Sequence, residues 1–341
     1  MLIIPFFPVF ARKPGFDSPP ILPYYSSHTQ IDSKLDRRKI MQNTRSREII
    51  STLLLLLTAM IWGAAFVAQS VGADNVGAFT FLASRSWLAG VALLPLVAVM
   101  RRKTDRPSAG SGDRRTLVTG GLLCGFFLFI ASAAQQIGIA TTTTAKAGFL
   151  TALYVIIVPI LSIVVRKKVP VRVWISALIA VTGLYLLCMK GRFSLEAGDA
   201  MELLCAFLFA CHIMIIDRFS PKTDGVAMSC IQFFACALFS TVCALLFEHP
   251  HWAQIRAALL PILYAGIFSS GVGYTLQIIS QKNLHPTVAS ITMSLESVFS
   301  AVCGWILLHQ ALNGREILGC LLMFSAIILA QLPSPGQNDR N

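Results

Sequence analysis

The stretch TALYVIIVPILSIVVRKKVPVRVW, from Thr151 to Trp174, decides the fold of this chain. No residue from Thr151 to Val165 is charged, and Arg166, Lys167 and Lys168 follow at once. Another apolar run begins almost immediately afterwards. A long uncharged run that ends in cations is typical of a helix that crosses a bilayer and is held at the headgroups by its basic end. The stretch therefore predicts a membrane helix, a short basic loop and the start of a second membrane helix.

The composition extends this prediction to the whole chain. Of 341 residues, 55% are hydrophobic and 13% are charged, and the mean hydropathy is +0.69. A soluble globular chain has about 25% charged residues, so this one is expected to use the lipid bilayer as its solvent. The net charge of +12 would suit a nucleic-acid partner, but the cations lie between apolar runs and form no clustered patch. We therefore expect no nucleic-acid partner.

Ten apolar runs are long enough to cross a membrane. They do not alternate in hydropathy as the strands of a membrane β-barrel do. The predicted fold class is an all-α integral membrane protein with ten transmembrane helices. The predicted spans are residues 49–70, 78–100, 117–137, 145–165, 172–189, 199–217, 225–247, 258–280, 287–308 and 315–332.

The Lys and Arg residues of the short loops predict the orientation. If the N-terminus is cytoplasmic, the loops after spans 2 and 4 lie in the cytoplasm. These two loops hold most of the loop cations: Arg101, Arg102, Lys103, Arg106, Arg114, Arg115, Arg166, Lys167, Lys168 and Arg172. Lys190, Arg192, Arg256 and Arg315 then lie outside, so the bias is strong in the first half and weak in the second. We expect an inner or plasma membrane protein with both termini, including the tail 333–341, in the cytoplasm.

Residues 1–48 do not fit the membrane pattern. The opening MLIIPFFPVF is short, is broken by Pro5 and Pro8, and has its cations after the apolar part instead of before it, unlike a signal peptide. Residues 14–30 are rich in Pro, Ser and Tyr, which is typical of disorder. Met41 opens an ordinary short basic lead into span 1. The extension is therefore predicted to be either a disordered cytoplasmic tail or a segment upstream of the true start at Met41.

The two halves of the chain resemble each other at an offset of about 145 residues. In each half a polar start, a long span, a short polar break and a second span follow one another from Thr144 and from Pro286. Residues 49–189 hold spans 1–5 and residues 199–332 hold spans 6–10. Because five is an odd number, the second half must enter the membrane in the opposite orientation. An inverted repeat of this kind recurs in secondary transporters.

Three stretches carry a resemblance to a known family: WGAAF in span 1, AKAGFLTALYVIIVPIL in span 4 and HPTVASITMSLESVFSAVCGWILL in span 9. Together they resemble the EamA family of the drug/metabolite transporter (DMT) superfamily over Ile49 to Leu332. The resemblance implies ten helices, two repeats and export or exchange of a small metabolite. The family commonly has Leu-Glu-Pro in span 9 and Gly-Glu after it. This chain has Leu295-Glu296-Ser297 and His309-Gln310 instead, and the missing proline predicts a straighter span 9.

The chain has no motif of an ATP-binding loop, GxxxxGK, and no HExxH or GxSxG motif of a hydrolase. Its nine cysteines lie in apolar runs without the spacing of a zinc site and are expected to be small buried hydrophobic residues. We expect no catalytic residues, no metal and no cofactor, so a transporter of this sequence would use a gradient, exchange or a partner ATPase.

The ionisable residues inside spans are the first candidates for function, because a charge at the centre of a span costs about 2.5–3.5 kcal/mol. Arg85 lies in span 2 and Glu296 lies near the middle of span 9. Both are expected to face the bundle interior or water. Arg85 would attract an anionic group such as a carboxylate, and Glu296 would tune or couple its release, with proton coupling as one option. A structural ion pair or snorkelling for Arg85, and a neutral hydrogen-bonded acid for Glu296, remain open.

The other candidates for substrate binding or gating are polar or aromatic. Lys146 is also explained by snorkelling to the headgroups, and the glutamines by water at helix ends or by bonds between helices. Asp199 and Glu202 start span 6, where acids suit a helix N-terminus, and are assigned no function. Asp217 and Arg218 end span 6 and are expected at the cytoplasmic interface. The candidates are Trp62, Gln69, Gln136, Lys146, Tyr154, Tyr274 and Gln277.

The predicted function is a secondary transporter that exports or exchanges a small solute, such as an amino acid or a related amphipathic metabolite, by alternating access. The substrate, coupling ion, direction and oligomeric state stay open, including a homodimer. Two other classes are kept as alternatives: an intramembrane enzyme acting on a lipid-linked substrate, and a membrane scaffold without transport. An enzyme would need a cluster of His, Asp or Glu at one membrane face, and a scaffold would need no polar cavity.

Overall fold

A computed structural model describes the chain except residues 1–27, 104–113, 142–143, 190–196, 309–312 and 333–341. For residues 28–44, 101–103, 144–146 and 304–308 it describes the backbone alone. All regular elements of the described residues are helical. In chain order they are α1 (His28–Ala73), α2 (Ala78–Lys103), α3 (Arg114–Ile139), α4 (Thr144–Ala152), α5 (Tyr154–Val164), α6 (Val171–Cys188), α7 (Ala197–Phe219), η2 (Ser220–Lys222), α8 (Gly225–Phe247), α9 (Trp252–Ala257), α10 (Leu259–Leu263), the π-helix η3 (Tyr264–Tyr274), α11 (Thr275–Gln281), α12 (Pro286–Met293), α13 (Glu296–Leu308) and α14 (Gly314–Gln331).

The described residues contain ten helical stretches that are long and apolar enough to cross a membrane, which confirms the predicted ten-span fold. Six spans are single helices, and span 6 adds the short η2 to α7. Spans 4, 8 and 9 combine shorter helices: α4 with α5, α10 with η3 and α11, and α12 with α13. Large apolar side chains such as Leu178, Leu245 and Ile328 are about two-thirds exposed. A surface of this kind is stable only against lipid.

The N-terminal part divides from the rest at Ile49, and α1 crosses that point. Residues 1–27 of the predicted extension lie outside the described residues, as does the predicted tail 333–341. Residues 28–48 belong to α1, and the predicted nature of the extension stays a prediction. Whether Met41 is the true start stays a prediction.

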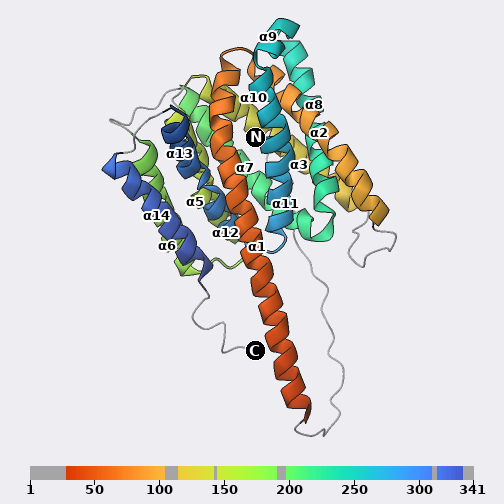
Figure 1. Cartoon of the computed structure of the whole chain (residues 1–341), viewed down its shortest axis with the longest axis vertical. Coiled ribbons are helices and arrows are strands. Elements are labelled where there is room, and N and C mark those ends of the chain that lie inside the picture. The colour runs from red at the N-terminus through yellow and green to blue at the C-terminus, as the bar shows by residue number, and fades with distance from the viewer. Residues whose placement is uncertain (1–27, 104–113, 142–143, 190–196, 309–312, 333–341) are drawn as a thin grey trace, which may run out of the picture. The chain divides into compact units, whose positions relative to one another are not determined.

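Within residues 50–341, helices from opposite repeats pack along each other. Helix α2 packs along α8, and α6 packs along α14, as Figure 1 shows at the two sides of the bundle. The α6–α14 crossing is close because Gly183 and Gly319 face each other: a Cβ added to either would lie 2.6–2.7 Å from the carbonyl oxygen of the other. Small residues allow this approach of two membrane helices. The broad interfaces of the fold therefore join the two repeats.

Spans 4 and 9, which are equivalent in the two repeats, are both interrupted near the middle. Leu153 N–H donates to Leu150 at 3.2 Å, and Leu295 N–H donates to Thr292 at 3.3 Å, so each span makes a tighter turn there. Span 9 is therefore broken, and the prediction of a straighter span was wrong. At this break, which has no proline, the Ser294 hydroxyl donates to the carbonyl of Ile291 at 2.8 Å, a side-chain bond that competes with the regular backbone bonds.

Candidate functional site

A cavity with both polar and aromatic lining lies at the level of the two helix breaks. Thr151 and Tyr154 reach it from the break in span 4, and Met293 and Glu296 from the break in span 9. Both repeats thus contribute to one site. The remaining lining residues are Trp62, Ala65, Phe66, Gln69, Arg85, Gln135, Phe209, Ile213, Ser269, Tyr274 and Gln277.

Arg85 is the cation of the cavity and is only 4% exposed. Its Nη1 donates to Gln69 Oε1 at 3.3 Å, and its guanidinium lies 5.9 Å from the centre of the Phe81 ring. Its Nε has no hydrogen-bond partner among the described residues. Because a guanidinium presents five donors in a fixed fork, Arg85 retains the capacity to bind a carboxylate or another planar anion.

Glu296 supplies the acidic group of the cavity and is 5% exposed. It is the first residue of α13, and its Oε1 accepts a hydrogen bond from the Tyr154 hydroxyl at 3.1 Å. Next to it, the Ser297 hydroxyl donates to the carbonyl of Gly148 at 3.3 Å. These two bonds join the broken spans, so Glu296 is held in a defined position with capacity for further donors.

An aromatic wall lies on another side of the cavity. The rings of Trp62 and Tyr274 are 4.7 Å apart between centroids, and Trp62 Nε1 donates to the Ser269 carbonyl at 3.1 Å. Ser269 and Tyr274 belong to the π-helix η3, a geometry that often occurs at functional sites. Gly273 permits the contact, because a Cβ there would lie 2.6 Å from Trp62 Nε1. The two ring planes are tilted by 50°, and together they give the cavity an aromatic surface beside its polar groups.

The structure brings seven of the nine predicted site residues to this cavity: Trp62, Gln69, Arg85, Tyr154, Tyr274, Gln277 and Glu296. Gln136 does not line it. Its Nε2 donates to the backbone oxygen of the lining residue Gln69 at 3.1 Å, so Gln136 contacts the cavity lining without being part of it. The side chain of Lys146 lies outside the described residues.

Sequence reasoning assigned no function to Glu202, which is fully buried next to the cavity wall. The hydroxyl of Thr151, a lining residue, donates to Glu202 Oε2 at 2.6 Å, and Gln135 Nε2 lies 3.5 Å from the same hydroxyl. Acidic residues at the start of a helix are usually exposed, so the position of Glu202 in span 6 gave no indication that it is buried near the cavity. The usable signal was the three-residue spacing from Asp199, which places both acids on one helix face.

Among the described residues no group of three or more His, Cys, Asp or Glu side chains could hold a metal ion. The polar inventory of the cavity is one guanidinium, one carboxyl group, three amides and several hydroxyls. Such a site can bind a small molecule by polar contacts and by contact with aromatic rings.

Two inverted five-span repeats that share a polar cavity define a class, the multi-pass membrane transporters. Within that class the chain belongs to the EamA-like transporter family, whose family model matches residues 49–189 and 197–332. It is 27% identical over 287 residues to an uncharacterized transporter of Archaeoglobus fulgidus, which covers 84% of this chain and 87% of the relative. It is 21% identical over 281 residues to the uncharacterized transporter YoaV of Bacillus subtilis, covering 81% and 94% of the two chains. A solved crystal structure with 18% identity matches the fold with a TM-score of 0.66 and covers 82% of this chain and 96% of that one.

Proposed function

We propose that this protein is a secondary transporter that exports or exchanges a small amphipathic metabolite with an anionic and a donor-bearing end, such as an amino acid. The observation that carries the proposal is the pair Arg85 and Glu296, two buried ionisable side chains in one cavity lined by both repeats. Arg85 would bind the carboxylate of the solute, and Glu296 would accept hydrogen bonds from its ammonium group. The ring surface of Trp62 and Tyr274 would contact the side chain.

The proposed cycle is alternating access, in which the cavity opens to one face of the membrane at a time. The absence of a GxxxxGK motif favours a gradient or exchange as the energy source. Glu296 can exchange a proton, so it is the proposed site of coupling if transport is driven by protons. We place the protein in the inner or plasma membrane with both termini in the cytoplasm, on the basis of the basic loops after spans 2 and 4.

Transport in proteoliposomes tests the proposal, with the substrate first narrowed by comparing the media of cells that lack and cells that overproduce the protein. Arg85→Ala and Glu296→Gln are expected to lower uptake of the identified solute at least about tenfold, since each removes a charge-assisted contact. Arg114→Ala is the matched control, because Arg114 is an exposed cation outside the cavity. Full uptake with unchanged pH dependence in both cavity variants would refute the proposed roles.

A further inference from the structure

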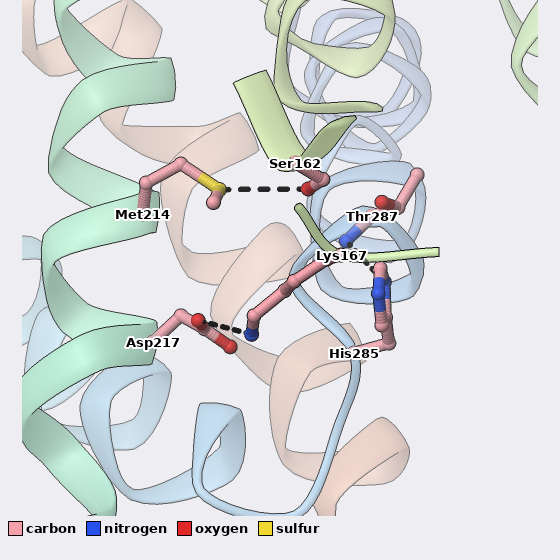
Figure 2. A network of polar contacts seen from close by, with 6 residues as sticks. All are labelled: Ser162, Lys167, Met214, Asp217, His285 and Thr287. Carbon is pink, nitrogen blue, oxygen red and sulfur yellow. Dashed lines mark hydrogen bonds and ion pairs between the residues drawn. The ribbon is translucent and has the colours of Figure 1, made fainter. Parts of the chain in front are cut away.

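A second ionic cluster lies away from the cavity, at the face that carries Arg114, Arg115 and Arg172. It consists of Lys167, Asp217 and His285. The ammonium of Lys167, which follows α5, forms an ion pair with the carboxylate of Asp217 near the end of α7. Figure 2 shows the Lys167 side chain extended to Asp217, with His285 close by. Lys167 belongs to the first repeat and the other two residues to the second, so the pair ties the repeats together at this face.

The backbone at the end of α5 holds Lys167 in place. Arg166 N–H donates to the Ile163 carbonyl and Lys167 N–H donates to the Ser162 carbonyl, both at 2.8 Å. This is a Schellman motif, which needs a left-handed residue, and Arg166 has a φ of 61°. L-residues with side chains adopt this conformation rarely. The left-handed backbone at Arg166 is therefore locally strained, and the sharp turn that it makes places Lys167 within reach of Asp217.

The three helices that end at this cluster also line the cavity. Asp217 lies one turn beyond the lining residue Ile213 on α7, and His285 caps the helix α12 that reaches the cavity at Met293. Helix α5 begins with the lining residue Tyr154 and packs against both α7 and α12. One turn above the ion pair, the Ser162 hydroxyl lies 3.6 Å from Met214 Sδ (Figure 2). The three helices α5, α7 and α12 therefore contact one another between the cluster and the cavity.

A polar stripe runs from the cavity in the same direction. Gln277 lines the cavity, and Ser280 and Gln281 follow on the same face of α11. All three are at most 2% exposed, and each has a side-chain oxygen without a hydrogen-bond partner among the described residues. The hydroxyl of Thr287, next to His285 in the cluster, has the same property. Unpaired buried polar groups are costly, and opening of this face would let water satisfy them.

We propose that the ion pair Lys167–Asp217 is the gate that closes the path between the cavity and the basic face, and that the stripe Gln277–Ser280–Gln281 lines this path when the gate opens. This proposal rests on the proposed transport function. It adds the residues that close and line the path on one side of the membrane. Asp217 is 12% exposed and Lys167 is 37% exposed at the side chain. Removing either member leaves a partly buried charge of the other without its partner, which favours separation of the helices.

The test measures how fast position 280 reacts with a membrane-impermeant maleimide, without any substrate. Ser280→Cys is introduced into the full-length chain in membrane vesicles with the basic face accessible, and modification at position 280 is read by mass spectrometry so that the nine native cysteines do not interfere. Asp217→Asn and Lys167→Ala are each expected to raise the rate about tenfold, through a shift in the population of the open state. Lys168→Ala is the matched control, because Lys168 is the exposed neighbour of the gate lysine.

The exchanged pair Lys167→Asp with Asp217→Lys separates gating from damage to the fold. It restores opposite charges, so its rate is expected to return to within about twofold of the parent. Equal rates in the parent and both single variants, or an exchanged pair as fast as the single variants, would overturn the proposal. Because the labelling needs no solute, a failed gate leaves the proposed transport untouched, and a failure to transport leaves the labelling result standing.

Discussion

Tyr154 and Glu296 occupy equivalent places in the two repeats and are hydrogen bonded to each other, with the Tyr154 hydroxyl 3.1 Å from Glu296 Oε1. Each is the first residue of the second half of a broken span. The breaks thus bring the ends of half-helices to the cavity, and the bond between them links the two repeats at its centre. Discontinuous helices in corresponding positions are a recurring way of building a transporter site.

We predict that Tyr154→Phe weakens transport while the fold is retained. The change removes one hydrogen bond to Glu296 and no ring contact, so the KM for the identified solute should rise roughly five- to tenfold. Uptake kinetics in proteoliposomes measure the KM, and thermal unfolding in detergent shows whether the fold is retained. Tyr185→Phe, at an exposed position, is the control, and an unchanged KM in Tyr154→Phe would show that this bond does not prepare the site.

Arg85→Met should abolish transport without loss of stability. Arg85 is a buried cation whose one described hydrogen bond goes to a neutral amide, Gln69. Replacing a buried charge by an apolar side chain of similar length is often neutral or stabilising, by up to about 1–4 kcal/mol. The melting temperature is expected to stay equal or to rise as uptake disappears. A marked fall in melting temperature would instead identify Arg85 as a structural residue.

The gate should respond to pH through His285. Burial lowers the pKa of His285 below its ordinary value, the Lys167 ammonium lowers it further, and Asp217 acts in the opposite direction. Neutral His285 accepts the Thr287 N–H through Nδ1 at 3.4 Å. Because this pKa is depressed, neutral His285 contributes its full stabilisation of the folded state above about pH 6.5, the ordinary pKa of histidine. This contribution is lost as the pH falls through the pKa of His285 in the folded state.

Protonated His285 would lose its acceptor atom, repel Lys167 and attract Asp217, which weakens the ion pair. Labelling of Ser280→Cys, corrected for the intrinsic pH dependence of the maleimide reaction with a small thiol, should therefore accelerate as the pH falls below the ordinary pKa of histidine, about 6.5. His285→Asn keeps a helix-capping side chain that does not titrate. A flat corrected rate in the parent, or the same acceleration in His285→Asn, would exclude His285 as the sensor.

The crossing of α6 and α14 should tolerate no added side chain. Gly183→Val would place a Cβ 2.7 Å from the Gly319 carbonyl and is expected to destabilise the protein by about 1–3 kcal/mol. Gly314→Ala is the comparison, because a Cβ there meets nothing within 4 Å. Thermal unfolding in detergent compares the two, and equal melting temperatures would argue against a tight crossing.

Hydropathy predicted all ten spans because burial in lipid sums over about twenty residues and leaves little ambiguity. The cost of a charge within a span singled out Arg85 and Glu296, and the structure places both in one cavity. The break in span 9 was missed because no proline marks it, and the sequence does not reveal the bond of the Ser294 hydroxyl to the Ile291 carbonyl found there. Local bonds of this kind compete with helix formation only in their packed surroundings.

The Lys167–Asp217 pair could not be predicted for a similar reason. Lys167 looked like one of several topology-determining cations, and Asp217 like an ordinary residue at the end of a span. Their pairing follows from the approach of α5 and α7 and from the turn at Arg166. The position of Glu202 next to the cavity could not be predicted either, since its contact with Thr151 joins residues of different spans.

The packing of α2 along α8 and of α6 along α14 has a consequence for the two halves of the chain. A separately produced fragment 49–189 would leave the long contact surfaces of α2 and α6 without their partners. Only a second fragment that contains α8 and α14, inserted in the membrane in the opposite orientation, could cover them. The halves should therefore be unstable when expressed singly and should recover as a complex when made together from two genes.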